Sequence, residues 1–361
     1  MPKFSVEKGD VKRMVNWGVI GAGGIADRRT IPEGILPARN AKLVAVMDVD
    51  AQRAEAVAAK YGVNKYYTKE EDLLADDEVQ AVYIATPVYL HCHQTVIAAE
   101  HKKHVLCEKH MAMSIQEAED MIKTCKSNGV KLGIGFMMRF HAYHRKLKAM
   151  IQAGLLGKIV MGRAQLTCWY PDIPGAWRQV PELGGGGSLA DMGSHCIDLL
   201  EMFIGKVAEL TAFTNTLVHK YPAEDTATVL LRFETGAHGI VDNYFNVPDA
   251  ASKNVLEIYG TKGSVLAKGT IGQMPSGEMM AYLQPEERSY EALQAREAPE
   301  VTEQEIAVTP INMYQAEIEN FSECIEKDTE PLVTGEEGLW NLRIILAAYE
   351  SARSGQRICI K

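Results

Sequence analysis

The stretch that decides the fold is VNWGVIGAGGIA, which runs from Val15 to Ala26. Its first half is a short apolar run typical of a buried strand, and Gly21, Gly23 and Ala26 follow it in a GxGxxA pattern. Glycine at these positions lets the backbone turn sharply and approach a pyrophosphate, whose charge then lies at the positive end of the next helix. The pattern predicts a dinucleotide-binding turn, although a GxG alone also occurs in ordinary glycine turns.

A carboxylate at the expected distance strengthens this interpretation. Asp48 ends the next apolar run, about twenty residues further on, where it can accept hydrogen bonds from the adenosine ribose hydroxyls. A carboxylate there would also repel the 2'-phosphate of NADP, and no arginine lies between it and Arg53. We therefore expect NAD, not NADP, as the cofactor.

The alternation of strand and helix continues to Phe136. Short runs rich in valine and isoleucine alternate with stretches of helical spacing, which is typical of a parallel sheet covered by helices. Ala51 to Tyr61 predicts a helix that stops at Gly62, and Ser114 with Glu117 forms a capping box for another. The predicted strands are Val15 to Ile20, Lys42 to Asp48, Val79 to Ala85, His104 to Cys107 and Lys131 to Phe136.

The pattern changes after Arg139, where strands follow one another with tight turns between them. The predicted elements are a helix at about Tyr143 to Ala153, strands at Asp225 to Phe233, Ala237 to Asn246 and Leu256 to Tyr259, loop or edge structure at Gly277 to Gln304, and closing helices around Met313 to Glu326 and Glu336 to Ala352. The sequence thus predicts an α/β protein of two domains. Residues 1–138 form a doubly wound parallel sheet that binds NAD, and residues 139–361 form a mostly antiparallel sheet that binds substrate.

Composition narrows the class of protein. No run of about 18 apolar residues occurs, and Met1 to Asp10 is polar, so we expect neither a membrane span nor a signal peptide but a cytoplasmic protein. A formal net charge of -9 with interspersed charges disfavours nucleic acid as a partner. The seven cysteines are scattered without a CxxC pair, which indicates buried thiols and neither a zinc site nor a disulfide framework.

Polar residues follow two of the predicted strands at their carboxyl ends, the edge where ligands bind in such sheets. Thr86, Pro87 and His91 come after one strand, and Glu108 and Lys109 end another. An amine at the end of a buried strand must pair with a carboxylate or face a ligand cavity. Adjacent strand residues point to opposite faces, so we discount Glu108 as the partner of Lys109, which leaves another acid or a ligand.

A glycine cluster in the second domain, Gly184 to Gly187, precedes a predicted helix. On that helix Asp191 and His195 lie four residues apart and share one face. A carboxylate and an imidazole beside a glycine-rich loop can orient an alcohol, and histidine has a pKa suited to accepting its proton. The alternative is structural, with Asp191 capping the helix and His195 packing against it.

Taken together, these residues resemble the glucose-fructose oxidoreductase / inositol dehydrogenase / rhizopine catabolism (Gfo/Idh/MocA) family. The matching segments are GAGGIA at Gly21 to Ala26, ATPxxxH at Ala85 to His91, the EK pair at Glu108 and Lys109, and GGGSLADMGSHCIDLL at Gly185 to Leu200. The resemblance runs from about Asn16 to the segment Pro331 to Ala352, nearly the whole chain. It implies a Rossmann domain followed by an α/β domain with a large open sheet, and a homo-oligomer (dimer, tetramer or higher).

The resemblance also implies roles for individual residues. The catalytic residues are Lys109, Asp191 and His195. The cofactor contacts are Gly21, Gly23, Gly24, Ile25, Ala26, Asp48, Thr86, Pro87, His91, Glu108 and Arg139. Substrate contacts are expected at the three catalytic residues and at Tyr170, Trp177 and Arg178. The chain departs from the family at His110, where proline is usual, and we expect this histidine to be structural and not to titrate beside the substrate.

Two further groups of residues leave alternatives open. Trp169, Tyr170 and Trp177 surround the loop before the glycine cluster, where they can stack on a sugar ring or simply pack. His91 with His93, and His141 with His144, have spacings that suit a metal but lack a third ligand, so we predict no metal.

The hypothesis that follows is an NAD-dependent oxidoreductase for a secondary ring alcohol of a sugar, glycoside or cyclitol, leaning to the C3 hydroxyl of a pyranoside. His195 or Lys109 would take the hydroxyl proton, and Lys109 would stabilise the developing negative charge. One alternative is an NAD-dependent glycosidase that acts by transient oxidation and elimination. Another is a non-catalytic dinucleotide or sugar sensor, against which the three catalytic candidates argue.

Overall fold

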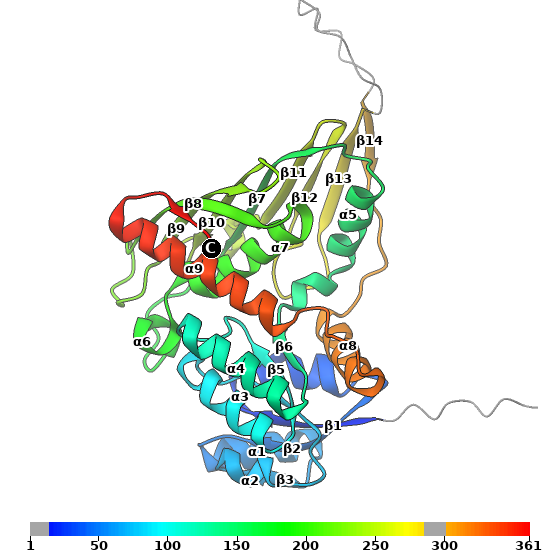
Figure 1. Cartoon of the computed structure of the whole chain (residues 1–361), viewed down its shortest axis with the longest axis vertical. Coiled ribbons are helices and arrows are strands. Elements are labelled where there is room, and N and C mark those ends of the chain that lie inside the picture. The colour runs from blue at the N-terminus through cyan, green and yellow to red at the C-terminus, as the bar shows by residue number, and fades with distance from the viewer. Residues whose placement is uncertain (1–13, 285–300) are drawn as a thin grey trace, which may run out of the picture.

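The computed structural model describes residues 14–284 and 301–361 and contains two sheets stacked along the long axis of the molecule (Figure 1). The reading of Met1 to Asp10 as polar and free of a signal peptide therefore lies outside the described residues. The first sheet follows the early alternation of strand and helix, and the second follows the later hairpins. The fold is thus the α/β combination predicted from the sequence.

The first sheet has six parallel strands in the order β3-β2-β1-β4-β5-β6. Their bounds are β1 (Val15–Ile20), β2 (Ala41–Met47), β3 (Lys65–Tyr67), β4 (Ala81–Ile84), β5 (His104–Glu108) and β6 (Leu132–Gly135). The chain order reverses between β1 and β4, so a crevice forms beyond their carboxyl ends. Five of the six strands were predicted, and the doubly wound parallel sheet is confirmed.

The helices that accompany this sheet include two that end where the sequence signals predict. They are η1 (Ala26–Ile35), α1 (Ala51–Tyr61), α2 (Glu70–Leu74), η2 (Val88–Leu90), α3 (His91–Glu100) and α4 (Ile115–Asn128). Asp50 caps α1 by accepting two backbone N–H groups, and Gly62 ends it in the left-handed conformation. Ser114 and Gly129 bound α4 in the same way.

The second sheet has nine strands in the order β14-β13-β12-β11-β7-β10-β9-β8-β15, and all neighbours are antiparallel except β7 and β10. The strands are β7 (Ile159–Thr167), β8 (Val207–Asn215), β9 (Thr226–Phe233), β10 (His238–Tyr244), β11 (Val255–Gly260), β12 (Gly263–Lys268), β13 (Glu278–Leu283), β14 (Thr302–Glu305) and β15 (Ile358–Cys359). The prediction of loop or edge structure from Gly277 to Gln304 is wrong for β13, which pairs with β12 and β14, because its pairing is tertiary. Residues 285–300 of that region lie outside the described residues.

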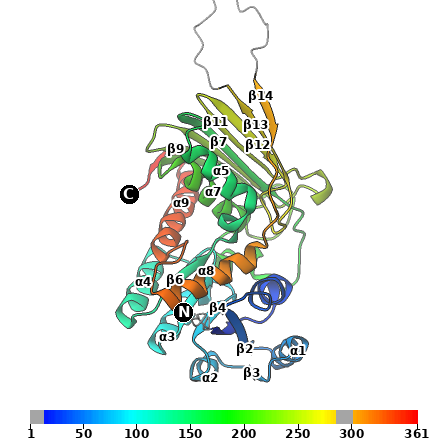
Figure 2. The same ribbon diagram turned by 90° about the vertical axis from the view of Figure 1, so that its right-hand side faces the viewer.

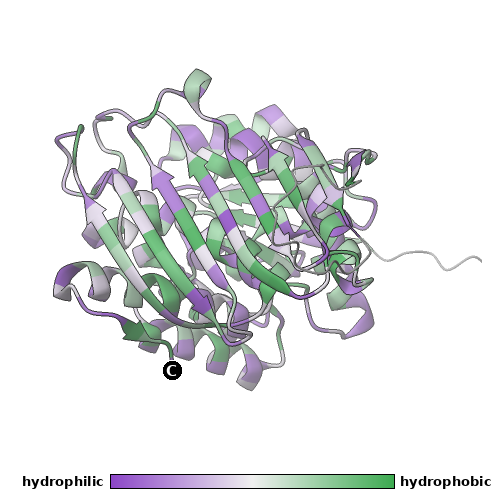
Figure 3. Ribbon diagram, turned by 90° about the horizontal axis from the view of Figure 1, so that it is seen from above, coloured by the Kyte–Doolittle hydropathy of each residue, from purple (hydrophilic) through white to green (hydrophobic). Residues whose placement is uncertain are grey.

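Three helices lie on one side of the second sheet, α5 (Ala142–Gln152), α7 (Ser194–Ile204) and α9 (Gly335–Ser354) (Figure 2). The view in Figure 3 looks onto the other side, where the strands lie in front of the helices. On β7, β8 and β9, Val160, Phe213 and Leu230 are exposed. The second domain therefore has the open sheet that the resemblance implied.

The C-terminal half of the chain returns to the first sheet through α8 (Met313–Lys327). Ile318 and Phe321 of this helix are buried in one cluster with Trp17 of β1, and the Trp17 indole N–H donates to Ser322 Oγ at 3.1 Å. A division of the chain near Arg139 thus separates the two sheets, while α8 belongs by its packing to the first. The two-range division into domains stays a prediction.

Two searches of residues 14–284 and 301–361 gave no positive result. No helix there has the length and apolar character needed to cross a membrane. No three histidine, cysteine, aspartate or glutamate side chains within the same ranges are grouped as a metal site would need. All seven cysteines carry free thiols.

Candidate active site

A cavity of about 470 Å³ opens between the carboxyl edge of the first sheet and the inner side of the second. Its lining comes from the cofactor turn, from the end of β5, from the start of α7 and from α8. The lining residues are Ile25, Arg28, Glu108, Lys109, Met137, Met138, Leu166, Thr167, Cys168, Tyr170, Arg178, Asp191, Met192, His195, Asp249, Ser252, Asn254, Gly272, Gln273 and Tyr314. The three predicted catalytic side chains are all among them.

The ammonium of Lys109 is held by Asp191. Lys109 Nζ donates to Asp191 Oδ1 at 2.7 Å and to the Asp191 carbonyl oxygen at 2.6 Å. Arg178 Nε donates to the same Oδ1 at 3.2 Å. Burial raises the pKa of the Asp191 carboxyl, but the charges of Lys109 and Arg178 outweigh burial and hold that pKa well below its usual range. Glu108 is not the ion-pair partner of Lys109, as predicted, although the reason given was wrong: β5 ends at Glu108, and both residues line the same cavity.

His195 faces the same cavity as a neutral imidazole. The residue is buried at 5% exposure, its Nδ1 has no partner among the described residues, and the ring stands edge-on to Phe136. Burial, and then the charge of Lys109, lower the pKa of His195 well below its usual value. A neutral imidazole in the site has a free lone pair, so it can accept a proton.

The helix that carries these residues begins just beyond the glycine cluster, as predicted, but its first turn is a π-helix. Leu189–Gly193 forms this turn (η5), and α7 continues it from Ser194. Asp191 therefore lies on the wider turn and His195 on the regular helix, and both still line the cavity.

The glycine cluster, Gly184 to Gly187, lies where neighbouring groups leave no space for side chains. A Cβ on Gly185 would overlap His110 Nε2, one on Gly186 the Tyr349 hydroxyl, and one on Gly187 the carbonyl oxygen of Glu224. The short helices before it, η4 (Trp177–Gln179) and α6 (Pro181–Gly184), end at this point. Close approach therefore explains the glycines.

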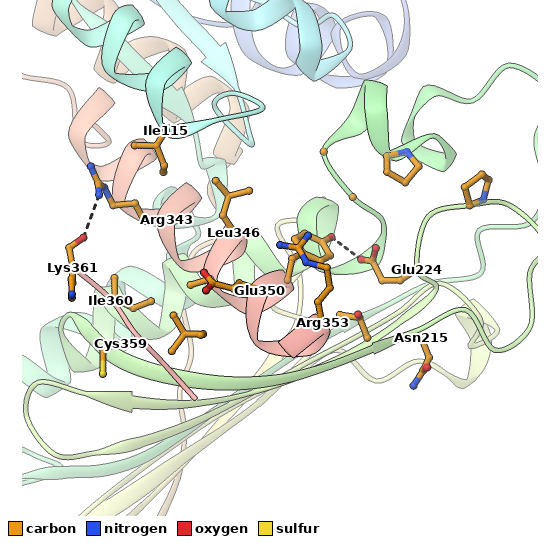
Figure 4. Close-up of a pocket in the computed structure, with 18 of the residues that line it drawn as sticks. Ile115, Asn215, Glu224, Arg343, Leu346, Glu350, Arg353, Cys359, Ile360 and Lys361 are labelled. Atoms are coloured by element: carbon orange, nitrogen blue, oxygen red, sulfur yellow. Dashed lines mark hydrogen bonds between the residues drawn. The ribbon is translucent and has the colours of Figure 1, made fainter. Parts of the chain in front are cut away.

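Glu224 fixes this loop from behind. Its carboxylate accepts hydrogen bonds from Gly187 N at 2.8 Å and Leu189 N at 2.9 Å. It also accepts one from the Tyr349 hydroxyl at 2.9 Å, the dashed line that ends at Glu224 in Figure 4. The cavity drawn in Figure 4 is larger, about 810 Å³, and lies between α9, the end of β8 and residues 358–361. Its described lining includes neither a histidine nor a residue of the cofactor turn, so the smaller cavity is the better candidate for the chemistry.

His110 follows Lys109 in the chain and lies outside the cavity lining. It is buried against Gly185, and burial lowers its pKa to about 3. The peptide bond that joins it to Lys109 is cis. The side chain is placed for packing, as the sequence analysis expected.

The cofactor turn fits a dinucleotide. Gly21 has φ +88, and a Cβ there would meet Thr86 and the Ala85 backbone at about 3 Å, so only glycine lets the turn close. Gly24 has φ +52 with open space beyond it, and the next helix begins at Ala26. This cradle of small residues at a helix N-terminus suits a pyrophosphate.

Asp48 is not alone at the end of β2. It is buried at 5% exposure, accepts a hydrogen bond from Asp50 N at 3.0 Å and forms an ion pair with Arg53 Nη1 at 3.2 Å. The same Arg53 side chain covers Gly23, where its Cδ would lie 3.1 Å from a Cβ. Arg53 is the first arginine after Asp48 in the sequence, and the first turn of α1 brings its side chain back over the cofactor turn.

Several predicted contacts lie outside the cavity lining. Both ring nitrogens of the buried His91 face backbone carbonyls, of Thr86 at 3.0 Å and of His110 at 3.1 Å, and burial lowers its pKa to about 4. His91 therefore joins the loop after β4 to the segment after β5. Pro87 caps η2, and the Thr86 hydroxyl donates to Gln94.

Arg139 lies in an ion-pair network away from the cavity. Its guanidinium contacts Asp198 at 2.7 Å and Glu337 at 2.6 Å, which joins the start of the second domain to α7 and α9. Its expected contact with the cofactor stays a prediction that this position does not support. Of the aromatic candidates, Tyr170 lines the cavity. The ring of Trp177 packs against Arg178, whose Cζ lies 4.1 Å from the ring centroid.

Other lining residues gave no signal in the sequence. Tyr314 comes from α8, and Gly272 and Gln273 come from the loop between β12 and β13, far along the chain from either motif. Arg28 follows the cofactor turn, and only its spacing to that turn offered a hint.

Comparisons with known proteins agree with this architecture. Residues 15–136 match a model described as an oxidoreductase family with an NAD-binding Rossmann fold, and residues 144–266 match the GFO/IDH/MocA C-terminal domain. The chain is 31% identical to the 1,5-anhydro-D-fructose reductase of Ensifer adhaerens over 345 residues, which covers 95% of this chain and 98% of the relative. It is 29% identical to the D-xylose 1-dehydrogenase (NADP(+)) 2 of Haloferax volcanii, covering 95% and 98%.

A solved structure agrees as well. The aldose-aldose oxidoreductase of Caulobacter crescentus, complexed with glycerol, superposes with a TM-score of 0.84 at 27% identity and covers 96% of this chain and 100% of its own. Both sheets of the present chain therefore have counterparts in an oxidoreductase. The chain belongs to the Gfo/Idh/MocA oxidoreductase family, whose N-terminal part is an NAD-binding Rossmann fold.

Proposed function

We propose that this oxidoreductase transfers a hydride between a secondary ring alcohol of a sugar, glycoside or cyclitol and NAD. The observation that carries the proposal is the ion pair of Lys109 with Asp191 in the cavity that His195 also lines. This pair joins the end of a strand in the nucleotide-binding sheet to the helix that carries the imidazole. An ammonium and a neutral imidazole in one cavity can bind and deprotonate the same hydroxyl group.

The roles follow from the state of each group. His195 accepts the hydroxyl proton, because its imidazole is neutral and open to the cavity. Lys109 donates a hydrogen bond to the same oxygen and stabilises the negative charge that develops on it. Asp191 keeps the ammonium in place. A bound NAD would supply the acceptor for the hydride that leaves the alcohol carbon.

NAD is preferred to NADP in this proposal because of Asp48. Its buried carboxylate is placed to accept hydrogen bonds from ribose hydroxyls and to repel a 2'-phosphate. Arg53 is already engaged with that carboxylate, which supports the same preference. The relative from Haloferax volcanii carries NADP(+) in its name, so the preference needs measurement.

Among alcohols we favour the C3 hydroxyl of a pyranoside. Tyr170 offers an aromatic wall in the cavity, and aromatic faces stack on the apolar face of sugar rings. Relatives named for anhydrofructose and xylose support a sugar without fixing the position of oxidation.

We also propose a homo-oligomer that uses the open face of the second sheet. Phe213 is 69% exposed and Leu230 51% exposed on that face, which is unusual for large apolar side chains. Light scattering after size exclusion should give a multiple of the chain mass, and Phe213→Asp should lower it. A monomeric wild-type protein would contradict this part.

The central test is a screen of NADH formation across monosaccharides, glycosides and inositols, with both NAD and NADP. Lys109→Met and His195→Ala should each lower turnover by at least about a hundredfold, the low end of what positioned acid or base groups contribute, and leave NAD affinity nearly unchanged. Normal turnover in either variant would remove its assigned role. Release of free sugar from a chromogenic glycoside without accumulating NADH would instead support the glycosidase alternative, and no turnover of any substrate would support a sensor.

A further inference from the structure

Glu108, which the sequence analysis expects to contact the cofactor, is an acid of the cavity to which the proposed reaction gives no specific task. It ends β5 directly before Lys109 and lines the same cavity. Its Oε2 accepts a hydrogen bond from Lys109 N at 3.1 Å, and its Oε1 accepts one from the Tyr83 hydroxyl. The hydroxyl of Tyr83 is in turn the acceptor for Thr30 Oγ1 at 2.9 Å, so its own proton is directed at Glu108. Both carboxylate oxygens therefore accept, as an ionised carboxylate does.

No cation in the described part of the chain forms a salt bridge with this carboxylate. The ammonium of Lys109 and the guanidinium of Arg178 both contact Asp191. The other acid nearby is Glu317 of α8, which is fully enclosed and has an unpartnered Oε1. Burial, and then the charge of Glu108, raise the pKa of Glu317 well above its usual value. Burial also raises the pKa of Glu108, but the charge of Lys109 and the hydrogen bonds from Tyr83 and Lys109 N oppose that rise. Because Glu108 accepts hydrogen bonds at both oxygens and Glu317 leaves one oxygen unpartnered, Glu108 carries the charge and Glu317 holds the proton.

A negative charge here discriminates between the two forms of a nicotinamide cofactor. The ring is cationic in NAD+ and neutral in NADH. Hydride transfer requires the ring to lie within reach of the alcohol carbon that Lys109 and His195 hold, and Glu108 faces that same cavity of about 470 Å³. A charge in so confined a space is screened less than one in water.

We propose that Glu108 makes the site bind the oxidised cofactor more tightly than the reduced one. This inference rests on the proposed function, because it needs a nicotinamide in the cavity. It assigns to Glu108 an electrostatic task distinct from the proton transfer of His195.

The test compares affinities for NAD+ and NADH, measured by titration calorimetry and by nucleotide fluorescence. Glu108→Gln should lower the ratio of NAD+ affinity to NADH affinity by about tenfold, the order expected when one charge is removed from a small cavity whose other charges stay in place. Glu317→Gln is the matched control, since it replaces a neutral acid in the same cluster and should leave the ratio unchanged. Asp48→Asn should weaken both nucleotides equally, because it acts at the adenosine end.

The outcomes separate the claims. An unchanged ratio in Glu108→Gln overturns the inference, and so does a variant that loses both nucleotides, because removing the charge should spare NADH. An equal fall of the ratio in Glu317→Gln also overturns it, since the effect would then come from disturbing the cluster. Wild-type protein that binds neither nucleotide would overturn the proposed function itself.

Discussion

Lys109 Nζ lies 2.7 Å from Asp191 Oδ1, and this contact joins two residues 82 positions apart in the chain. One ends a strand of the nucleotide-binding sheet, and the other lies on the π-helical turn after the glycine cluster. The ion pair therefore fixes the position of the π-helical turn relative to the end of the strand. Any change to it should alter both stability and turnover.

Replacing Asp191 by asparagine should lower stability in a pH-dependent way. The variant leaves Lys109 and Arg178 without a carboxylate, which should cost roughly 1 to 3 kcal/mol. The folded pKa of Asp191 lies below its unfolded value, so its contribution is complete above about pH 4 and is lost as the pH falls further. Denaturation of wild type and variant should diverge at neutral pH and converge in acid.

The control for this experiment is Asp172→Asn, which changes an exposed carboxylate on the preceding loop. It should give the wild-type free energy of unfolding at every pH. A constant difference between wild type and Asp191→Asn from neutral to strongly acidic pH would contradict the role of the ion pair.

The pH dependence of turnover should reflect the buried imidazole of His195. Because burial and Lys109 lower its pKa well below the usual value, the neutral, proton-accepting form persists at neutral and mildly acidic pH. kcat/KM for the alcohol should therefore stay level as pH falls through about 6.5, the ordinary histidine value, and decline only in stronger acid. A half-maximal point at the ordinary value would mean that another group titrates or that the imidazole is solvated.

Much of this fold follows from local sequence, and the exceptions have local causes. The GxGxxA turn, the caps Asp50 and Gly62, and five of the six parallel strands follow from spacing and turn chemistry. The short strand β3 was not predicted because Lys65–Tyr67 is polar and only three residues long. β13 was not predicted because it is stabilised by pairing with β12 and β14, and such tertiary pairing cannot be recognised in a short stretch of sequence.

The residues of the site likewise divide into those with a local sequence signal and those without one. Lys109, Asp191 and His195 carried signals because each lies beside a strand end or a glycine cluster. Tyr314 and Gln273 carried none, because only the return of α8 and of the β12–β13 loop brings them to the cavity.

Gly186→Ala should disrupt the loop that holds Asp191. A methyl group there would overlap the Tyr349 hydroxyl and meet Ala190 Cβ at 3.0 Å, in addition to the cost of φ +151. Gly175→Ala is the matched control, because Gly175 also has a positive φ but nothing within 4 Å. It should cost only the conformational term, roughly 1 to 2 kcal/mol, whereas Gly186→Ala should cost more and reduce kcat.

The cause can be isolated with a second change. In the Gly186→Ala background, Tyr349→Ala removes both overlapping atoms, the hydroxyl oxygen and Cζ, so the double variant should be more stable than the sum of the two single changes predicts. Strict additivity would show that the overlap with Tyr349 is not the source of the damage.

Cofactor preference should respond to the pairing of Asp48 with Arg53. Asp48→Ser removes the carboxylate that would repel a 2'-phosphate and frees the Arg53 guanidinium, which is half-exposed beside the cofactor turn. Affinity for NADP should rise relative to NAD by about ten- to a hundredfold, the effect of one or two charge-assisted hydrogen bonds.

Asp50→Ser is the control, since Asp50 also contacts Arg53, at 3.5 Å, but caps α1 and is exposed. The double variant Asp48→Ser/Arg53→Ala should lose the gain in NADP affinity. If it keeps the gain, loss of repulsion alone explains the switch and Arg53 has no part in it.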